Sequence, residues 1–240
     1  MSVDALSAAE LVNAIERAIA SGQRLFVGNH NLHSAYLLAV DPSVRESWAV
    51  FDYRLIDGFP ILVRASLRAG RWLGARRRLG SLDWVPLAAR SASVGRIAIV
   101  GASAESNRDA VEALESMTAD SVVRGWAGEN WNTGLGRLVL SELNEFRPDL
   151  VLVGLGMPLQ ERFLAENAEK LPPAVFATVG GAIDQLAGHQ HAAPRWTGRF
   201  GVEWLWRVVK HPRRLAFRYF AEPVVLATLV LRRSVFQVRR

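Results

Sequence analysis

The stretch Pro148-Asp-Leu-Val-Leu-Val-Gly-Leu-Gly-Met-Pro158 decides the fold of this 240-residue chain. Its apolar run is bounded by polar and turn residues, which is typical of a buried strand. The two glycines after it let the backbone come close to a ligand, and Pro158 suits the first turn of a helix that we expect to reach Lys170. A buried strand, a glycine turn and a helix form the repeating unit of a parallel sheet.

A similar succession recurs along the second part of the chain. We predict further strands at residues 96–100, 121–126 and 174–179. The first leads through Gly101 into a helix ending near Met117, the second through a Gly- and Asn-rich loop at 128–136 into another helix, and the third into Gly180-Gly181. The sequence therefore predicts an α/β fold, a Rossmann-like, mainly parallel sheet with flanking helices. Ligands bind such sheets at the carboxyl ends of the strands.

The first part of the chain predicts the same alternation less regularly. Ser7 and Glu10 have the spacing of a capping box, and the helix that they begin ends at Gly22. The elements expected next are a strand at 24–27, a polar turn at 28–31, a helix at 32–40 and a strand at 48–56. This last strand ends at Asp57-Gly58.

Composition limits the classes of protein that the chain can belong to. Hydrophobic residues make up 50% of it and charged residues 22%, which suits a folded domain. The lack of cysteine excludes disulfides, thiolate metal sites and a cysteine nucleophile. Residues 1–20 carry three acids and lack the basic start and unbroken apolar run of a signal peptide, so we expect a cytoplasmic protein.

The positive charge is concentrated at the C-terminal end. Residues 199–240 contain ten Lys or Arg and two Glu, a balance of +8, whereas the whole chain carries +6. We therefore predict an α/β core at 1–198, with halves at about 1–93 and 94–198, and a basic, aromatic, helical appendage at 199–240. A smaller basic patch, with no acid between Asp57 and Asp83, contains Arg64, Arg68, Arg71, Arg76, Arg77 and Arg78.

Three functions are open for the arginines of the appendage. They can neutralise a nucleotide diphosphate, lie on anionic lipid headgroups or bind nucleic acid. The apolar run at 223–231 is too short to cross a bilayer, and the arginine pairs on both sides of it are typical of an interfacial segment. A helix packed on the core with solvated arginines is the alternative. We favour contact with an anionic membrane surface.

Polar residues follow the predicted strands of the first half. The Asp57 carboxylate can act as a general base, although Asp-Gly is a common turn dipeptide and local sequence favours the turn. Asn29 and Asn31 can hydrogen-bond hydroxyl groups, and Asn31 would equally cap the helix at 32–40. His30 and His33 have no supporting carboxylate nearby in sequence, so we predict surface or polar-pocket positions for them and no metal site.

The glycine turns of the second half suit a phosphate. Gly154 and Gly156 precede a helix whose N-terminus offers unpaired amides to an anion. The dinucleotide fingerprint lacks its third glycine, Gln160 and Glu161 stand in the first turn, and there is no Walker lysine. The sequence thus supports pyrophosphate binding but neither NAD binding nor ATP hydrolysis. Asp184, after Gly180-Gly181, can accept hydrogen bonds from a nucleoside or simply complement its helix N-terminus.

Several motifs occur in order along the chain. After residues 148–161 they are Val179-Gly-Gly-Ala-Ile-Asp184, Ala193-Pro-Arg-Trp196, Glu203-Trp-Leu-Trp-Arg207, and His211-Pro-Arg-Arg214 with Arg218-Tyr219. Together with Asn31, Asp57-Gly58 and Arg77-x-x-Gly80, they make residues 25–219 resemble the WecG/TagA/CpsF glycosyltransferase family. The chain departs from the family pattern at Asn29, where many relatives have Thr, at Leu159, where a basic residue is usual, and at Phe59-Pro60, which resembles only some branches.

The resemblance implies an inverting, metal-independent transferase without a cofactor. Such enzymes move a sugar, often a hexosamine derivative, from a UDP-sugar to a polyprenyl-diphosphate-linked acceptor at the inner face of the cell membrane. The half at 1–93 would then hold the acceptor and the half at 94–198 the donor. A homo-oligomer is left open.

The resemblance also assigns roles to single residues. Asp57 becomes the general base, Asn31 a substrate-binding residue near Asn29, and Arg77 a ligand of the acceptor or donor phosphates. The residues expected to line the donor pocket are Gly101, Gly154, Gly156, Gln160, Glu161, Gly180, Gly181 and Asp184. Arg207, Arg214 and Arg218 would close over the diphosphate from the appendage.

Two other classes compete with a transferase. A nucleotide-binding oxidoreductase or epimerase can use the same sheet, but it needs the dinucleotide fingerprint that is missing. A non-enzymatic RNA-binding protein would account for the pI near 10.6 and the eight Trp. We expect no nucleic-acid partner.

Overall fold

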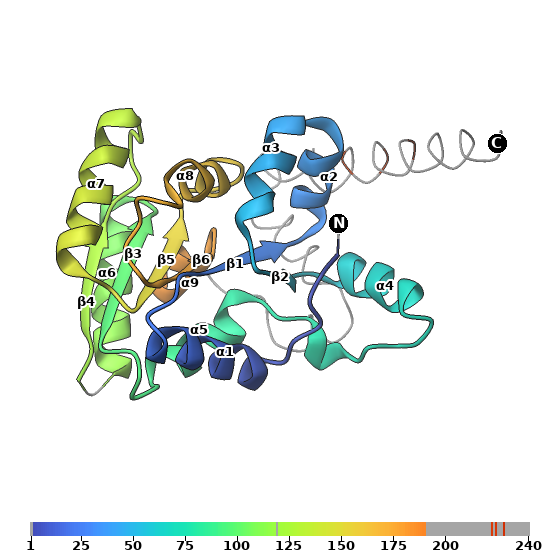
Figure 1. Ribbon diagram of the computed structural model, residues 1–240, viewed down its shortest axis with the longest axis horizontal. Helices are drawn as coiled ribbons and strands as arrows, with labels where there is room; N and C mark the ends of the chain where they lie inside the picture. Colours follow the sequence, from blue (N-terminus) through green and yellow to red (C-terminus); the bar gives the residue numbers. More distant parts are fainter. Residues whose placement is uncertain (1, 119, 191–221, 223, 225–227, 229–240) are drawn as a thin grey trace.

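A six-stranded sheet forms the centre of the molecule (Figure 1). The computed structural model describes residues 2–118, 120–190, 222, 224 and 228. The strands are β1 (Leu25–His30), β2 (Tyr53–Ile56), β3 (Arg96–Gly101), β4 (Val122–Trp126), β5 (Leu150–Gly154) and β6 (Val175–Thr178). Their order is β2-β1-β6-β5-β3-β4, and every neighbouring pair is parallel. The predicted α/β, Rossmann-like fold is confirmed.

Helices cover both faces of the sheet, so the molecule has three layers (Figure 1). One face carries α1 (Ala8–Ala20), α5 (Ser81–Ala89), α6 (Ala104–Met117) and α9 (Ala182–Leu186). The other carries α2 (Leu32–Val40), α3 (Pro42–Ser47), α7 (Thr133–Phe146) and α8 (Leu159–Asn167). Because β6 pairs with β1, a single sheet runs through both halves of the predicted core.

The apolar runs of the central strands explain this layering. Ile97 and Ile99 of β3 belong to the core under α1, α5, α6 and α9, whereas Ala98 and Val100 belong to the core under α3, α7 and α8. Successive side chains of a strand point to opposite faces, so a strand covered on both faces must be apolar throughout. All four of these side chains are fully buried.

A smaller unit packs at the β2 edge of the sheet. It contains α4 (Phe59–Arg68), whose Ile61 and Leu62 are buried against Ile56, and the short 3₁₀ helix η2 (Ala75–Arg77). The N-terminal residues lie along the same edge, where the Asp4 N–H donates to the Arg54 carbonyl at 2.9 Å. The N-terminal segment therefore covers part of the outer edge of β2.

Several element boundaries differ from those that the sequence predicts. Residues 28–30 belong to β1 and not to a turn, because their backbone pairs with β2 despite the polar side chains. The strand expected at 48–56 is instead the 3₁₀ helix η1 (Trp48–Val50) followed by β2. Helix α7 begins inside the loop expected at 128–136, where Asn132 caps it, and α8 ends at Asn167, before Lys170. The helices α4 and α5 were not predicted.

Three glycine turns meet at the carboxyl edge of the sheet. A Cβ built on Gly101 would lie 2.4 Å from the carbonyl carbon of Gly154, and one on Gly154 would lie 2.7 Å from the carbonyl oxygen of Gly180. A Cβ on Gly128 would lie 2.9 Å from the Gly101 Cα. Backbone atoms cannot yield as a flexible side chain can, so these contacts exist only because the residues are glycine.

Replacing Gly101 with Ala should therefore be severe. Gly101 has a φ of +125° and a backbone neighbour within 2.4 Å of the new methyl group, so we expect a loss of about 3 kcal/mol or more in the free energy of unfolding. The matched control is Gly22→Ala, at a φ of +62° with nothing within 4 Å, which should cost about 1 kcal/mol. Urea unfolding measures both, and equal losses would show that the close approach is unimportant.

Candidate active site

Asp57 lies at the carboxyl end of β2, between several elements. Its N–H donates to the His30 carbonyl at 2.9 Å, which continues the pairing of β2 with β1. The Asn31 Nδ2 lies 3.5 Å from the Asp57 Oδ2, at the limit of a hydrogen bond. The Asn31 Oδ1 accepts from the Ser34 N–H at 3.1 Å and so caps α2. Asn31 thus serves as a helix cap and also contacts the half-buried Asp57 carboxylate.

The loop before α5 also reaches this carboxylate. The Leu79 N–H donates to the Ile56 carbonyl at 2.8 Å. A Cβ on Gly80 would lie 3.8 Å from the Asp57 Oδ1, so the loop backbone comes close to the carboxylate. Asp57 therefore lies where β2, α2 and the start of α5 meet, whereas a simple surface turn would show none of these contacts.

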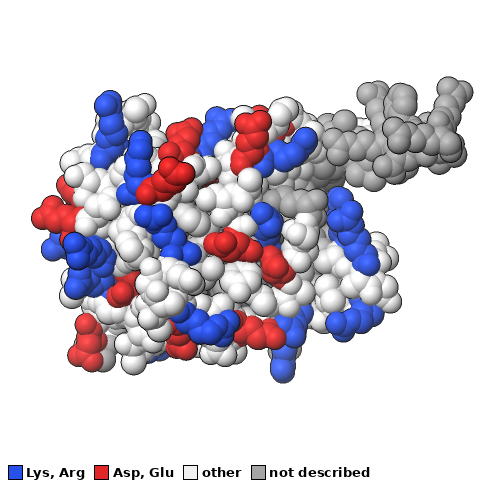
Figure 2. All heavy atoms as spheres, viewed as in Figure 1, with Lys and Arg blue, Asp and Glu red and all other residues white. Residues whose placement is uncertain are grey.

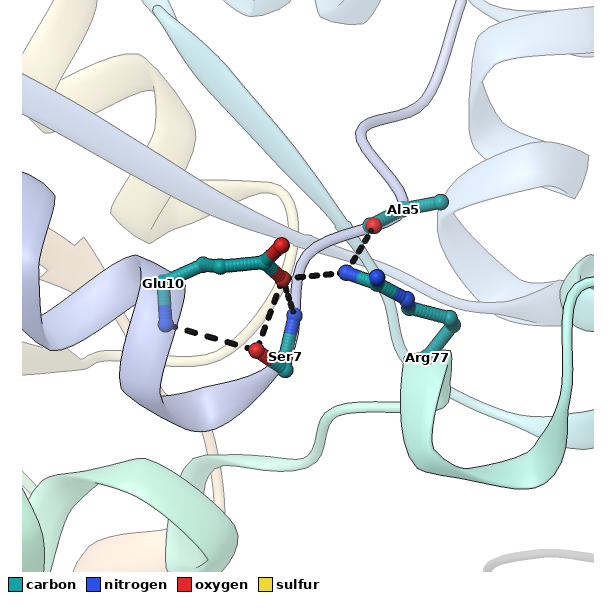
Figure 3. A network of polar contacts seen from close by, with 4 residues as sticks. All are labelled: Ala5, Ser7, Glu10 and Arg77. Carbon is teal, nitrogen blue, oxygen red and sulfur yellow. Dashed lines mark hydrogen bonds and ion pairs between the residues drawn. The ribbon is translucent and has the colours of Figure 1, made fainter.

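Arg77 contacts the N-terminal segment of the chain (Figure 3). Its Nη1 donates to the Ala5 carbonyl at 2.9 Å and forms an ion pair with Glu10. Hydrogen bonds from Ser7, and then the Arg77 guanidinium, lower the pKa of Glu10 to about 2. Arg77 therefore ties η2 to α1 in this structure, and its expected role as a phosphate ligand stays a prediction.

The end of β1 forms a polar seam with its neighbours. The Asn29 Nδ2 donates to the Ser81 Oγ at 2.6 Å, and the Asn29 N–H donates to the Thr178 Oγ1 at 3.2 Å. Among the residues that the structure describes, the buried Asn29 Oδ1 has no hydrogen-bond partner. Buried polar atoms rarely stay unpaired, so this oxygen is a candidate ligand atom.

Gln160 and Glu161 form a second buried polar group at the start of α8. Both side chains are fully buried, and the Gln160 Nε2 donates to the Glu161 Oε1 at 2.8 Å. In the described part of the chain, the Gln160 Oε1 and the Glu161 Oε2 lack partners. This helix follows β5, so the pair is a second candidate contact at the carboxyl edge.

The remaining predicted residues divide between this edge and the undescribed part of the chain. Gly156 and Gly180 have positive φ values, Gly181 precedes α9, and the half-buried Asp184 lies in the first turn of α9. The strands β2 and β5 are parallel members of one sheet, with β1 and β6 between them. The groups around Asp57 and Glu161 therefore lie at the same carboxyl edge of this sheet. Arg207, Arg214 and Arg218, with most of the predicted appendage, lie outside the described residues.

Sequence reasoning missed Ser81, Thr178 and Gly128, which complete this edge. Thr178 is the last residue of β6, and Ser81 is the first of α5. Their positions at the end of a strand and the start of a helix were the signals that could have found them.

The prediction for the two histidines is confirmed for His30 but missed a partner of His33. His30 is buried beside the Ser34 Oγ at 2.8 Å, as a polar-pocket residue, whereas His33 has a carboxylate partner after all, the Glu222 Oε1 at 2.8 Å.

One group of described residues has the composition of a metal site. Glu105, Asp109 and His189 place one ligand atom each within 4.8 Å of one another, between α6 and the end of α9. Asp109 is already paired, with the His189 Nε2 at 2.6 Å and with Arg108 at 3.1 Å. The hydrogen bond with Asp109 raises the pKa of His189 and lowers that of Asp109. These contacts account for the cluster as an exposed ion-pair group.

A surface hollow at the opposite edge of the sheet is unsuited to the same chemistry. Arg96, Arg147 and Asp149 are among its lining residues. The Asp149 Oδ2 accepts from the N–H groups of Gly95 and Arg96 at 2.9 and 2.8 Å, so this carboxylate holds the start of β3. Ligands of parallel sheets bind at the carboxyl edge, which is the other one.

The arrangement is typical of α/β proteins that bind phosphorylated ligands at the carboxyl edge of the sheet. Residues 1–240 match the model of the family described as "Glycosyl transferase WecG/TagA/CpsF family", and the chain belongs to this family. It is 36% identical over 77 residues to the N-acetylglucosaminyldiphosphoundecaprenol N-acetyl-beta-D-mannosaminyltransferase of Bacillus subtilis (strain 168). That match covers 32% of this chain and 30% of the relative, so it spans less than a third of either protein. Membership favours a transferase over the oxidoreductase and RNA-binding alternatives.

Burial moves the pKa values of two site residues in opposite senses. It lowers the pKa of His30 from 6.5 to about 4, with Arg64 adding to the effect, and raises that of Glu161 from 4.5 to about 7. For His30, the unfolded chain takes up a proton that the folded chain resists, so stability falls as the pH drops from 6.5 toward 4. For Glu161, the folded chain keeps a proton that the unfolded chain releases, so stability falls as the pH rises from 4.5 toward 7.

Glu161→Gln removes the second of these effects. The free energy of unfolding of the variant, relative to the unchanged protein, should rise by up to about 1.4 kcal/mol per pH unit between pH 4.5 and 7. Urea unfolding across this pH range measures the difference. Glu166→Gln, at an exposed position of the same helix, should show no such slope. A difference that is constant with pH would mean that Glu161 ionises normally in the folded protein.

Proposed function

We propose that this protein is an inverting glycosyltransferase that moves a sugar, of the hexosamine type, from a UDP-sugar to a polyprenyl-diphosphate-linked acceptor. The observation that carries the proposal is the half-buried Asp57 carboxylate beside Asn31 at the carboxyl edge, in a chain of this glycosyltransferase family. The name of the Bacillus subtilis relative, an N-acetylmannosaminyltransferase acting on N-acetylglucosaminyldiphosphoundecaprenol, supports the acceptor class and the hexosamine donor.

The proposed chemistry is a single displacement. The Asp57 carboxylate takes the proton of an acceptor hydroxyl, whose oxygen forms a bond to the anomeric carbon of the donor sugar. The bond from that carbon to the UDP oxygen breaks on the opposite side, so the configuration inverts and UDP leaves with the electron pair. The Asn31 amide, which already contacts the Asp57 Oδ2, would hold the carboxylate in position.

The donor side is proposed at the ends of β5 and β6. The glycine turns and the helix N-termini of α8 and α9 offer backbone N–H groups to a diphosphate. The unpaired Gln160 Oε1 and Asn29 Oδ1 are hydrogen-bond acceptors suited to sugar or base N–H and O–H groups. Arg207, Arg214 and Arg218 remain proposed ligands of the leaving UDP. The enzyme would work at the cytoplasmic face of the cell membrane, in the synthesis of a surface polysaccharide.

Asp57→Asn tests the base directly. An amide cannot take the proton, so turnover should fall by about a hundred- to ten-thousandfold. Stabilisation of the protein by UDP in thermal unfolding should remain, because Asp57 lies on the acceptor side. Near-normal turnover of the variant on a competent acceptor would exclude Asp57 as the base.

Asn31 supplies a companion pair of variants. Asn31→Ser and Asn31→Asp both keep an oxygen that can cap α2, and both lack the N–H that faces Asp57. Only Asn31→Asp adds a like charge, which should shift the acidic limb of the pH profile of kcat/KM to higher pH. Identical profiles for the two variants would argue against Asp57 as the titrating group.

Metal independence is also proposed, since the chain has no Asp-x-Asp sequence. Turnover should be unchanged in excess EDTA. A metal that assists the departure of a diphosphate contributes several kcal/mol, so its removal would cost about a thousandfold in rate. If EDTA inactivates the enzyme and Glu105→Gln does the same, the group of Glu105, Asp109 and His189 is the metal site instead.

A further inference from the structure

A second feature of the molecule lies on the outward side of α4 and the loop after it. Phe59, Leu67 and Trp72 are exposed there, with 37%, 77% and 55% of their surface accessible. The rings of Phe59 and Trp72 lie 6.2 Å apart, centre to centre. The same segment carries four exposed arginines, namely Arg64, Arg68, Arg71 and Arg76. These seven residues are the α4 surface.

The apolar part of the α4 surface is not needed by the core. Helix α4 already buries Ile61, Leu62 and Ser66 on its inner side. Leu67 and Trp72 point their apolar surface outward, where water solvates it at a cost. Large exposed apolar groups that lie together mark interaction sites more often than chance positions.

The charge of this segment has one sign. Residues 58–82 contain six Arg and no Asp or Glu. Figure 2 shows Lys and Arg side chains, and no Asp or Glu, over α4 at the right of the described part. The α4 surface therefore fits a partner that is both anionic and able to take up apolar side chains.

The segment is also held firmly in place. The Leu73 N–H donates to the Ser66 Oγ at 3.2 Å, and the Arg71 N–H donates to the Ser66 carbonyl at 3.2 Å. Arg77 ties its far end to Glu10 and Ala5, as Figure 3 shows. These contacts fix the backbone of the loop relative to α4.

We propose that the α4 surface is a membrane contact that lies on anionic phospholipid headgroups. Trp and Leu side chains enter the boundary between headgroups and acyl chains, and arginines pair with lipid phosphates. RNA would also attract the arginines, but it offers no environment for a Leu that is 77% exposed. The residues of this contact are different from those of the appendage predicted at 199–240.

The α4 surface begins close in sequence to the proposed catalytic base. Helix α4 begins at Phe59, two residues after Asp57. A membrane under α4 would bring lipid-linked substrates to the carboxyl edge without their leaving the bilayer. This purpose rests on the proposed function, whereas the lipid binding itself does not.

Co-sedimentation of the full chain with vesicles tests the contact. The probe is phosphatidylcholine vesicles with and without phosphatidylglycerol, at a salt concentration that leaves half of the unchanged protein bound. Leu67→Ser with Trp72→Ser should weaken binding to the anionic vesicles about tenfold or more. Arg64→Gln with Arg71→Gln should weaken it about thirtyfold.

Matched controls come from other exposed positions. Leu138→Ser, at a side chain 53% exposed on α7, and Arg17→Gln with Arg90→Gln should leave vesicle binding unchanged. The proposal is wrong if both α4 pairs bind like the unchanged protein, or if the controls weaken binding equally. It is also wrong if the α4 pairs lose RNA binding instead, or if light scattering shows that they only dissociate an oligomer.

A second measurement separates this proposal from the proposed function. Both α4 pairs should keep turnover on a detergent-soluble acceptor and lose it on the same acceptor in anionic vesicles. If the unchanged protein transfers no sugar to either acceptor, the proposed function fails while vesicle binding still decides the membrane contact. Equal loss of turnover on both acceptors would show that the substitutions damage the site and would contradict a membrane role.

Discussion

The close approach of three glycine turns is the constraint on which the carboxyl edge depends. Gly101 and Gly154 bring the ends of β3 and β5 into backbone contact, and Gly154 leaves room for Gly180 and Ile183 at the start of α9. These contacts are made within the protein, so the proposed donor side of the site does not need a ligand to form it. Preorganised backbone N–H groups of this kind spend little free energy on ordering when a ligand binds.

Side chains complete the candidate site at this edge. Asn31 connects α2 to Asp57, Ser81 connects α5 to Asn29, and the orphaned oxygens of Asn29, Gln160 and Glu161 are buried at the same edge. Each unpaired buried oxygen costs free energy, which the apolar layers on both faces of the sheet offset. Such a cost is expected where a protein keeps hydrogen-bonding capacity for a substrate.

Local patterns predicted much of the fold and only part of the site. The apolar runs located the central strands, and Asn31 with Asp41-Pro42 defined α2 as observed. Residues 28–30 were predicted as a turn because they are polar or glycine, but they belong to β1. Their pairing with β2 is not a local property of the sequence. The partner of Arg77 lies 67 residues away in sequence, so the tie to Glu10 could not be read from spacing. The burial of Glu161 likewise depends on packing and not on its neighbours in sequence.

The N-terminal segment along β2 has a consequence for the behaviour of the protein in concentrated solution. β2 is an edge strand, and edge strands present unpaired N–H and C=O groups that template pairing between molecules. Here the Asp4 N–H and carboxylate occupy the Arg54 C=O and N–H, and the pair of Arg77 with Glu10 keeps the segment in position. Protection of this edge against aggregation thus comes from residues that lie apart from the candidate site.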